Sequence, residues 1–430
     1  MYREYLGVLE LVGWFDGEDT TRATFSYAGE YLNATKNAVG LSSSLPLSSK
    51  TYGYEEFSPF FSNLLPEGAV YDALVLKYRC VRSDWLSILK NIGGECIGAF
   101  VLSPEDDLAG MRHIDYDRLT EDVVRDFREF PLATAVRTIG RSRLSLAGAQ
   151  AKTAMTLPEQ LDPRTAQVED WLLPIGNAPS THIIKFAPNG GAEMAQNECV
   201  CARLANLCGL EAMEPCLLDW LPGAVAIRRY DRPWMDVSGD RRPVRLHQLD
   251  LCQVWNVAPW FKYQVDDTVN YHQIVGSLIS NNSNNAFGDR YMFALRTVFN
   301  YLIGNVDFHL KNTSLLLSPD WARKDLAPAY DMLCVPLAGD YVTSLPWAYG
   351  EHRELDEVTP DDVVKTIEDL SVPVDMIQAD LFELCDVISN AQPNQFDDEL
   401  QEMAERIQDN ASGRLTTVLK IAERELDQRT

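Results

Sequence analysis

The sequence lacks any long, uninterrupted run of apolar residues: no stretch reaches the roughly 18 that a membrane-spanning helix requires. Its start, MYREYLGVLELVGWF, has no basic region followed by an apolar core and a small-residue cleavage site, so it does not resemble a secretion signal. The nine cysteines are odd in number and lack the spacing of a disulfide framework. These absences predict a cytoplasmic protein with reduced thiols and no membrane partner.

Positive charge is also scarce. The 430 residues carry 38 lysines and arginines against 63 aspartates and glutamates, which gives a formal charge of −25. A field of this sign repels phosphate backbones. We therefore expect DNA contact only indirectly, through a basic partner protein.

The order of apolar patterns predicts an α+β protein with two lobes. Residues 1–130 mix short strands and helices and end in a connecting segment, and residues 131–245 read as a small antiparallel sheet with one inserted helix. Residues 246–430 show a period near 3.6, which predicts an all-helical lobe. We expect a cleft between the α/β half and the helical half.

Polar residues gather after one strongly apolar helical stretch, in LIGNVDFHLKN. Asp307 precedes Asn312 by the five positions that separate the catalytic aspartate and the metal-binding asparagine of protein kinases. His309 and Lys311 lie between them. A capped polar turn is the alternative, whereas zinc binding by His309 is disfavoured because no second ligand lies at a suitable spacing.

The chain has no D-F-G motif, yet a kinase requires a second metal-binding carboxylate downstream of the loop. In DLAPAYDML, Asp331 follows a short apolar run and is the candidate. Asp325 competes with it, but Asp325 follows Arg323 and Lys324 and is expected to be a solvated partner of these cations.

A kinase also needs a strand lysine that reaches the phosphates of ATP. THIIKFAP places Lys185 between apolar neighbours, where burial is costly unless the ammonium group is paired. Glu198, on the following helical stretch, is the expected partner. The alternative is a surface lysine whose stem lies along the sheet.

Neither a G-x-G-x-x-G loop nor a Walker A motif is present. SLAGAQAK, residues 145–152, offers small residues whose amides could approach phosphate oxygens, although alone it would indicate only a tight turn. The candidate phosphate loop comprises Ala147, Gly148, Ala149, Gln150, Ala151 and Lys152.

Taken in order, these segments resemble the HipA family of toxin kinases over nearly the whole chain. LSSSLPLSS, FFSNLLPEG and IGGECIGAFVLSPED resemble the family's N-terminal subdomain. The later pieces follow in the family's order: SLAGAQAK, THIIKF, NECVCARLANLCGL, AIRRYDRPW, LHQLDLCQ, LIGNVDFHLKN and LAPAYDML.

The resemblance implies a kinase-like fold and a serine/threonine protein kinase that uses ATP and Mg²⁺. It implies that Asp307 accepts a proton, that Asn312 and Asp331 bind magnesium, and that Lys185 contacts the phosphates. Residues 147–152 would form the phosphate loop, with His309 near the phosphates. Arg228, Arg229 and Tyr230 would lie against the nucleotide as a hinge with main-chain bonds to adenine.

The family resemblance also implies partners. Such a toxin phosphorylates a cellular protein, typically an aminoacyl-tRNA synthetase such as the glutamyl enzyme, and thereby causes growth arrest or persistence. It is held by a small helix-turn-helix antitoxin, and the pair represses its own operon.

Ser145 matches the family's autophosphorylated serine, and phosphorylation there is expected to inactivate by charge repulsion near the γ-phosphate. The chain departs from the family pattern in two places near the nucleotide. Ala151 stands where glutamate is usual, and Arg228 stands where an acidic residue is common.

Two other functions are compatible with the residues. One is a small-molecule phosphotransferase with a kinase-like fold, which could share the D-x-x-x-x-N loop. The other is an inactive scaffold that acts as co-repressor with a DNA-binding partner. The N-terminal subdomain and Ser145 favour the toxin over the first, and the intact set Lys185, Asp307, Asn312 and Asp331 favours it over the second.

Overall fold

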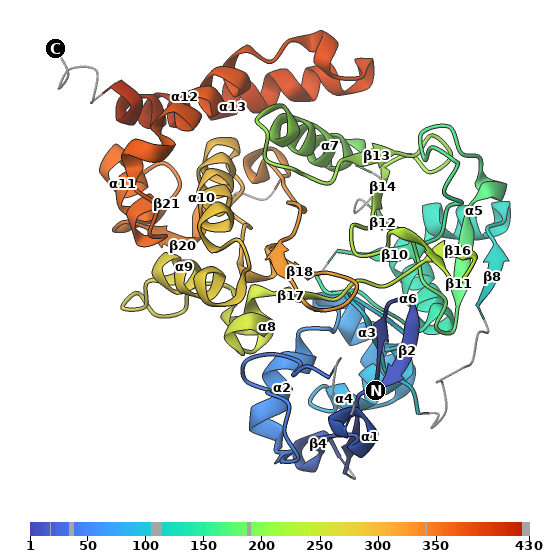
Figure 1. Cartoon of the computed structure of the whole chain (residues 1–430). Helices are drawn as coiled ribbons and strands as arrows, with labels where there is room; N and C mark the ends of the chain where they lie inside the picture. Colours follow the sequence, from blue (N-terminus) through green and yellow to red (C-terminus); the bar gives the residue numbers. More distant parts are fainter. Residues whose placement is uncertain are drawn as a thin grey trace. The chain divides into compact units, whose positions relative to one another are not determined.

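The computed structural model describes residues 1–17, 19–33, 38–104, 114–148, 150–186, 191–339 and 342–423 (Figure 1). The chain forms two compact units, and each unit is built from three separate segments of the sequence. The first unit comprises residues 1–191, 216–259 and 316–324, and the second comprises residues 192–215, 260–315 and 325–430. The domains predicted from the sequence, residues 1–130, 131–245 and 246–430, have other boundaries than these units. That division stays a prediction.

The first unit begins with two small sheets. β1 and β2 form a hairpin that turns at Leu6 and Gly7, both with positive φ, and β1 also pairs with β7. β4 lies between β3 and β5 in the second sheet. The strands are β1 (Tyr2–Tyr5), β2 (Val8–Leu11), β3 (Gly13–Asp16), β4 (Thr24–Tyr27), β5 (Thr51–Tyr52), β6 (Glu95–Cys96) and β7 (Phe100–Val101).

Aromatic side chains build the core beside these strands. Phe15 and Phe25 from the sheet contact Phe57 and Phe61 from α2, with ring centroids about 5 to 6 Å apart. The helices of this part are α1 (Gly29–Asn33), α2 (Tyr54–Ser62), α3 (Gly68–Tyr78) and α4 (Trp85–Ile92).

A four-stranded antiparallel sheet in the order β10-β12-β14-β13 follows. Its inner face packs on a buried cluster that includes Trp171, Ile184 and Phe186. The elements are β8 (Asp115–Arg118), α5 (Glu121–Glu129), α6 (Pro131–Ser142), β9 (Leu144–Ser145), β10 (Lys152–Met155), β11 (Leu172–Ile175), β12 (His182–Phe186), β13 (Pro215–Leu217), β14 (Ala224–Arg228), β15 (Trp234–Val237), β16 (Asp240–Pro243), β17 (Gln248–Asp250) and α8 (Leu251–Trp255).

The second unit is mainly helical. Side chains fix several helix starts: Asn270 caps α9, and Thr359 caps α11 with Pro360 in its first turn. α12 and α13 run side by side (Figure 1). The helices are α7 (Ala192–Leu207), α9 (Tyr271–Asn282), α10 (Ala286–Ile303), α11 (Pro360–Asp369), α12 (Val374–Asn390) and α13 (Gln401–Glu423).

One detail of the predicted fold is corrected. Residues 246–430 are not all helical, because strands occur between their helices: β17, β18 (Ser314–Leu317), β19 (Lys324–Leu326), β20 (Ser344–Tyr349) and β21 (His352–Glu354). β20 and β21 form a hairpin that turns at Gly350, whose φ of 54° favours glycine. These strands are too short to break the helical periodicity of the sequence around them.

The described residues contain no helix with both the length and the apolar character needed to cross a membrane.

Candidate active site

The second unit carries the predicted catalytic loop directly after α10. Gly304 ends this helix in the left-handed region with φ of 76°, and its N–H donates to the Tyr301 carbonyl at 3.0 Å. Asn305 then uses its side-chain amide to donate to Asn300 Oδ1 at 2.7 Å and its Oδ1 to accept the Asp307 N–H at 3.2 Å. The buried helix end therefore sets the position of Asp307.

Asp307 is the exposed member of this loop, with 52% of its side chain accessible. The Tyr263 hydroxyl donates to Oδ1, and the buried His309 places Nε2 at 3.9 Å from the same oxygen. The rings of Tyr263 and His309 meet edge to face at 5.1 Å. A carboxylate that is oriented by one donor and still open to solvent is suited to accept a proton from a bound hydroxyl.

Asn312 and Lys311 are buried within the short helix Leu310–Asn312. The Asn312 side-chain amide donates to the Asp307 carbonyl at 2.9 Å, and its backbone N–H donates to the His309 carbonyl at 2.9 Å. These bonds fix the aspartate and the asparagine relative to each other. The amide oxygen, which is the metal-binding atom in kinases, lies opposite the donated N–H.

Asp331 lies on a segment that is tied to this loop. The hydroxyl of its neighbour Tyr330 donates to the Lys311 carbonyl at 2.9 Å and lies 2.7 Å from Ser314 Oγ. Asp331 itself has φ of 61°, a conformation that costs a non-glycine residue energy and that occurs often at functional sites. Asp307, Asn312 and Asp331 thus belong to two linked segments of one unit.

The first unit presents two lysines from adjacent strands. Lys185 on β12 is the register partner of Lys152 on β10, so both side chains leave the same face of the sheet. Lys185 is buried and Lys152 is half-buried. Two ammonium groups that leave the same face of the sheet suit the binding of an anion such as the phosphates of ATP.

The phosphate loop brings backbone close to this pair. At Gly148, with φ of 105°, an added Cβ would lie 2.7 Å from the Lys152 ammonium nitrogen. The side-chain amide of Gln150 donates to the Phe186 carbonyl, and the Phe186 N–H donates to Ala151. A backbone turn with this positive φ, which favours glycine and lies beside an ammonium group, fits a phosphate; Ala149 lies outside the described residues.

Contacts within the first unit hold the start of the same loop. Ser145 is fully buried, and its hydroxyl donates to the Leu64 carbonyl at 2.5 Å. Further along, the Glu67 N–H donates to the Gly148 carbonyl at 3.0 Å, and Pro66 forms an isolated bridge with Gly148. Residues 64–67 of the N-terminal subdomain therefore position residues 145–148.

The predicted hinge residues have different surroundings. Arg228 is exposed at the end of β14, and the Tyr230 hydroxyl bonds to Gln248. The Arg229 side chain is buried against Glu95 and Asp231. The backbone N–H of Arg229 donates to the Thr181 carbonyl at 2.9 Å. Its guanidinium is thus committed to the protein interior, while the proposed adenine bonds from the hinge main chain stay a prediction.

Glu198 is buried on α7 in the second unit. Because Lys185 belongs to the first unit, the predicted pairing of these two side chains joins the units and stays a prediction.

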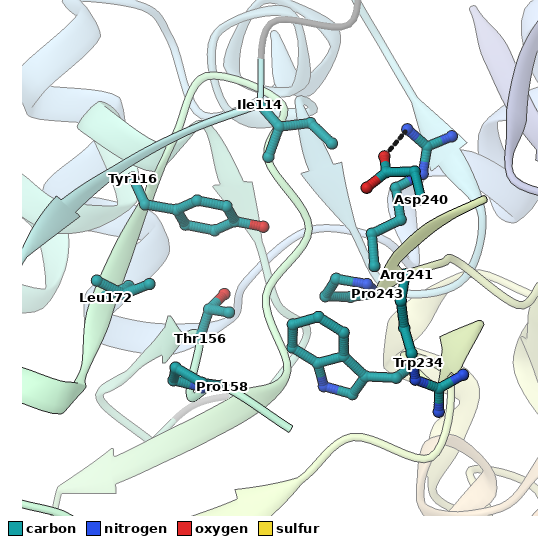
Figure 2. A pocket seen from close by; sticks show the side chains of 10 residues that line it. Ile114, Tyr116, Thr156, Pro158, Leu172, Trp234, Asp240, Arg241 and Pro243 are labelled. Carbon is teal, nitrogen blue, oxygen red and sulfur yellow. Dashed lines mark hydrogen bonds and ion pairs between the residues drawn. The ribbon is translucent and has the colours of Figure 1, made fainter. Parts of the chain in front are cut away.

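A cavity of about 350 Å³ in the first unit contains none of the predicted site residues. Trp234 and Tyr116 face it from opposite sides, with Pro158 and Pro243 nearby (Figure 2). The hydroxyls of Tyr116 and Thr156 donate to the Pro179 carbonyl at 2.9 and 3.0 Å.

Two features of the site were missed by sequence reasoning. The hydrogen bond from Tyr263 to Asp307 spans 44 residues and has no spacing signal, although WFKY is a local run of aromatic residues. The buried ionic cluster around Glu95 was missed as well. Its members come from distant segments, and nothing in the sequence indicates that Glu95 and the arginines, Arg229 among them, pair in the interior.

Comparison with known proteins identifies the fold as that of a HipA kinase. The structure superimposes on Shewanella oneidensis HipA, solved in a complex with HipB and its operator DNA, with a TM-score of 0.73. The match has 20% identity and covers 99% of this chain and 97% of that one.

Sequence comparison defines the family. Residues 144–411 match the HipA-like C-terminal domain, and residues 9–103 match the HipA N-terminal domain. The chain belongs to the HipA family. Among curated relatives, Putative kinase Y4mE of Sinorhizobium fredii is 27% identical, with 88% of this chain and 90% of Y4mE covered. The serine/threonine-protein kinase toxin HipA of Shewanella oneidensis is 23% identical, with 87% and 84% covered.

Proposed function

We propose that the protein is an ATP-dependent serine/threonine protein kinase that acts as the toxin of a toxin–antitoxin pair. The observation that carries the proposal is the joint fixation of Asp307 and Asn312 in one loop, to which Tyr330 ties the segment of Asp331. Relatives named as kinases and as a kinase toxin support it.

In this mechanism Lys185 and Lys152 bind phosphate oxygens, and the amides of residues 147–152 approach them from the loop. Asn312 and Asp331 would hold Mg²⁺. ATP with its metal supplies the γ-phosphoryl group and an activated leaving group. Asp307 accepts the proton of the substrate hydroxyl as the hydroxyl oxygen bonds to the γ-phosphorus and the bond to ADP breaks.

The test is transfer of labelled phosphate from ATP into the proteins of a bacterial extract. Asp307→Gln should abolish the labelled bands and the growth arrest, because the proton acceptor is lost. Asp325→Asn is the matched control, because it removes a nearby carboxylate outside the proposed mechanism, and it should keep both. Growth arrest that persists with Asp307→Gln, or label that appears only in small molecules, would contradict the proposal.

The family resemblance suggests the substrate and the partner. We propose an aminoacyl-tRNA synthetase as the phosphorylated protein and a small helix-turn-helix antitoxin as the partner. The Shewanella structure, which contains HipA with HipB and operator DNA, supports the second point. Identification of the labelled band by mass spectrometry tests the first.

We further propose that autophosphorylation of Ser145 inactivates the kinase. The Ser145 hydroxyl is buried and donates to the Leu64 carbonyl. A phosphate with about two negative charges at this place would be repelled by the carbonyl oxygen and would have no solvent around it. The phosphorylated loop could not occupy this place and would expose residues 145–148. Full ATP affinity and activity in the fully phosphorylated protein would overturn this.

A further inference from the structure

A short segment of the second unit presents apolar side chains to solvent. Trp260 is 69% exposed and Val265 is 60% exposed, while Phe261 and Tyr263 are each more than one third exposed. We call these four residues the aromatic ridge. Large apolar side chains that cluster on a surface commonly mark a binding site, whereas single exposed ones do not.

The backbone beneath the ridge is firmly anchored. The hydroxyl of Tyr271 donates to the carbonyls of Phe261 and Tyr263, both at 3.1 Å. The indole of Trp347 donates to the Lys262 carbonyl at 3.2 Å, and Tyr271 and Trp347 are themselves buried. The backbone of the ridge is therefore preformed and needs little further ordering when a partner binds.

Gln264 adds a second set of anchors from β20. Its N–H donates to the Pro346 carbonyl at 2.9 Å, and its Oε1 accepts the Ala348 N–H at 2.7 Å. Gln264 is buried while its two neighbours, Tyr263 and Val265, are exposed. This alternation shows that the polar residue supports the backbone and the apolar residues face outward.

The ridge is continuous with the proposed proton acceptor. The Tyr263 hydroxyl donates to Asp307 Oδ1, and the Tyr263 ring contacts His309. A hydroxyl that is bound at Asp307 therefore lies close to Tyr263. At its other end the ridge is followed by the exposed Asp266 and Asp267, with Arg353 at 3.6 Å from Asp267.

We propose that the aromatic ridge is the docking surface for the protein substrate, which rests on the kinase function proposed above. It would hold an apolar side chain of the substrate close to the phosphorylated serine or threonine. Because an extended chain advances about 3.3 Å per residue, this apolar residue lies within about five positions of the hydroxyl. The acidic end of the ridge adds a preference for a basic residue beyond it.

Tyr263 has a second role in this proposal as a positioning residue. Its hydrogen bond holds Asp307 Oδ1 in place before the substrate arrives and stabilises the charged carboxylate. Tyr263→Phe removes the bond but keeps the ring on the ridge. It should lower kcat, because Asp307 Oδ1 is then no longer oriented by the hydroxyl, and leave KM for the peptide nearly unchanged.

The probe is a library of peptides with one fixed serine and randomised neighbours, phosphorylated with labelled ATP by the full chain. The wild type should select an aromatic or large aliphatic residue at one or more positions within five of the serine. Trp260→Ala combined with Phe261→Ala should lose this selection and raise KM for the preferred peptide by about tenfold, with kcat little changed.

Phe382→Ala is the control, because Phe382 is also exposed but lies on α12, and this variant should keep the wild-type selection. ATP affinity of the double variant, measured by calorimetry, shows whether its fold and nucleotide site are intact. Absence of apolar selection in the wild type, or its retention in the double variant, would overturn the docking proposal. No phosphate transfer by the wild type to any peptide or extract protein would instead overturn the kinase function.

Discussion

Glu95 is fully buried and accepts bonds from three arginines that lie far along the chain. Arg245 approaches Oε2 at 2.7 Å, while Arg232 and Arg229 approach Oε1 at 3.0 and 3.3 Å. Ser180 adds its N–H and its hydroxyl, both at 3.0 Å. Burial alone would raise the pKa of Glu95, but the arginines together outweigh it and lower this pKa to about 2.

Neutralising Glu95 should destabilise the protein. Glu95→Gln leaves the arginines with one partner fewer and should lower the free energy of unfolding by about 3 to 5 kcal/mol in urea denaturation. The control is Arg241→Ala, which removes an exposed pair with Glu159 and should leave this free energy nearly unchanged, because solvent screens the pair.

The same carboxylate should make stability depend on pH. Its pKa is lowered from the ordinary value of 4.5, so the stabilisation is complete above pH 4.5 and is lost as the pH falls toward about 2. Asp231, whose pKa is also lowered by Arg229 and Arg232 against the effect of burial, acts in the same direction. In Glu95→Gln the free energy of unfolding should fall less steeply below pH 4.5 than in the wild type. An equally steep fall in both proteins would show that Glu95 does not cause it.

Gly148 allows a second test on a single residue. Gly148→Ala places a Cβ 2.7 Å from the Lys152 ammonium nitrogen and should lower ATP affinity by about tenfold in calorimetry. Gly239→Ala has the same backbone strain, with φ of 84°, but no atom within 4 Å of its Cβ. This control variant should lose stability but keep the ATP affinity of the wild type. Equal ATP affinity in the two variants would contradict a phosphate cradle at Gly148.

Residues with a role in a known motif could be found from the sequence, whereas residues defined by contact could not. Asp307 and Asn312 belong to one local loop. Their five-residue spacing can therefore be recognised directly in the sequence. Tyr263 and Glu95 act on partners 44 and more than 130 positions away. Such contacts depend on packing, which the sequence of a single chain does not display.

At the scale of elements, long periodic segments were predicted well and tight turns were not. The inserted helix that was expected within residues 131–245 is present as α7, and Gly209, with φ of 72°, follows its end. By contrast, the expectation of short strands within residues 1–130 does not locate the hairpin that turns at Leu6 and Gly7. Leu6 adopts a positive φ of 47°. Leucine rarely has this conformation, so its presence in the sequence does not predict a turn.

α10 supports the segment that carries Asp331, the proposed magnesium ligand. Its buried Arg296 donates to the Leu210 carbonyl at 3.1 Å and to the Ala327 carbonyl at 2.7 Å. Ala329 continues this contact by exchanging backbone bonds with residues 211 and 213. Asp331 follows two residues later, so the position of its segment depends on these bonds.

Arg296→Met should therefore affect both stability and metal use. Two buried carbonyls would lose their donor, which should lower the free energy of unfolding by about 2 to 4 kcal/mol in a denaturant titration. The Mg²⁺ concentration for half-maximal phosphate transfer should also rise, because Asp331 is less well held. Arg290→Ala removes a bond from the same helix to the Ala286 carbonyl, within α10 itself, and should leave the Mg²⁺ dependence as it is.

At the scale of the whole molecule, net charge determines how the chain meets nucleic acid. The formal charge of −25 opposes the approach of a phosphate backbone at physiological salt. A small basic partner would reverse the local sign of the field without any change in this chain. Association with such a partner would be strengthened by the same charge that keeps this chain away from DNA.

We expect the purified chain alone to show no binding to a short duplex of the proposed operator at about 0.15 M salt in fluorescence anisotropy. Addition of the proposed helix-turn-helix antitoxin should produce binding, and the assembly of this chain with it should weaken as salt rises, because the acidic chain and a basic partner attract each other. Asp307→Gln should bind the antitoxin–DNA complex as the wild type does, since the loss of a proton acceptor leaves the surface charge nearly the same. Micromolar binding of the chain alone to DNA would show that a local basic surface outweighs the acidic total, and repression by this protein would then not require the antitoxin to make the DNA contacts.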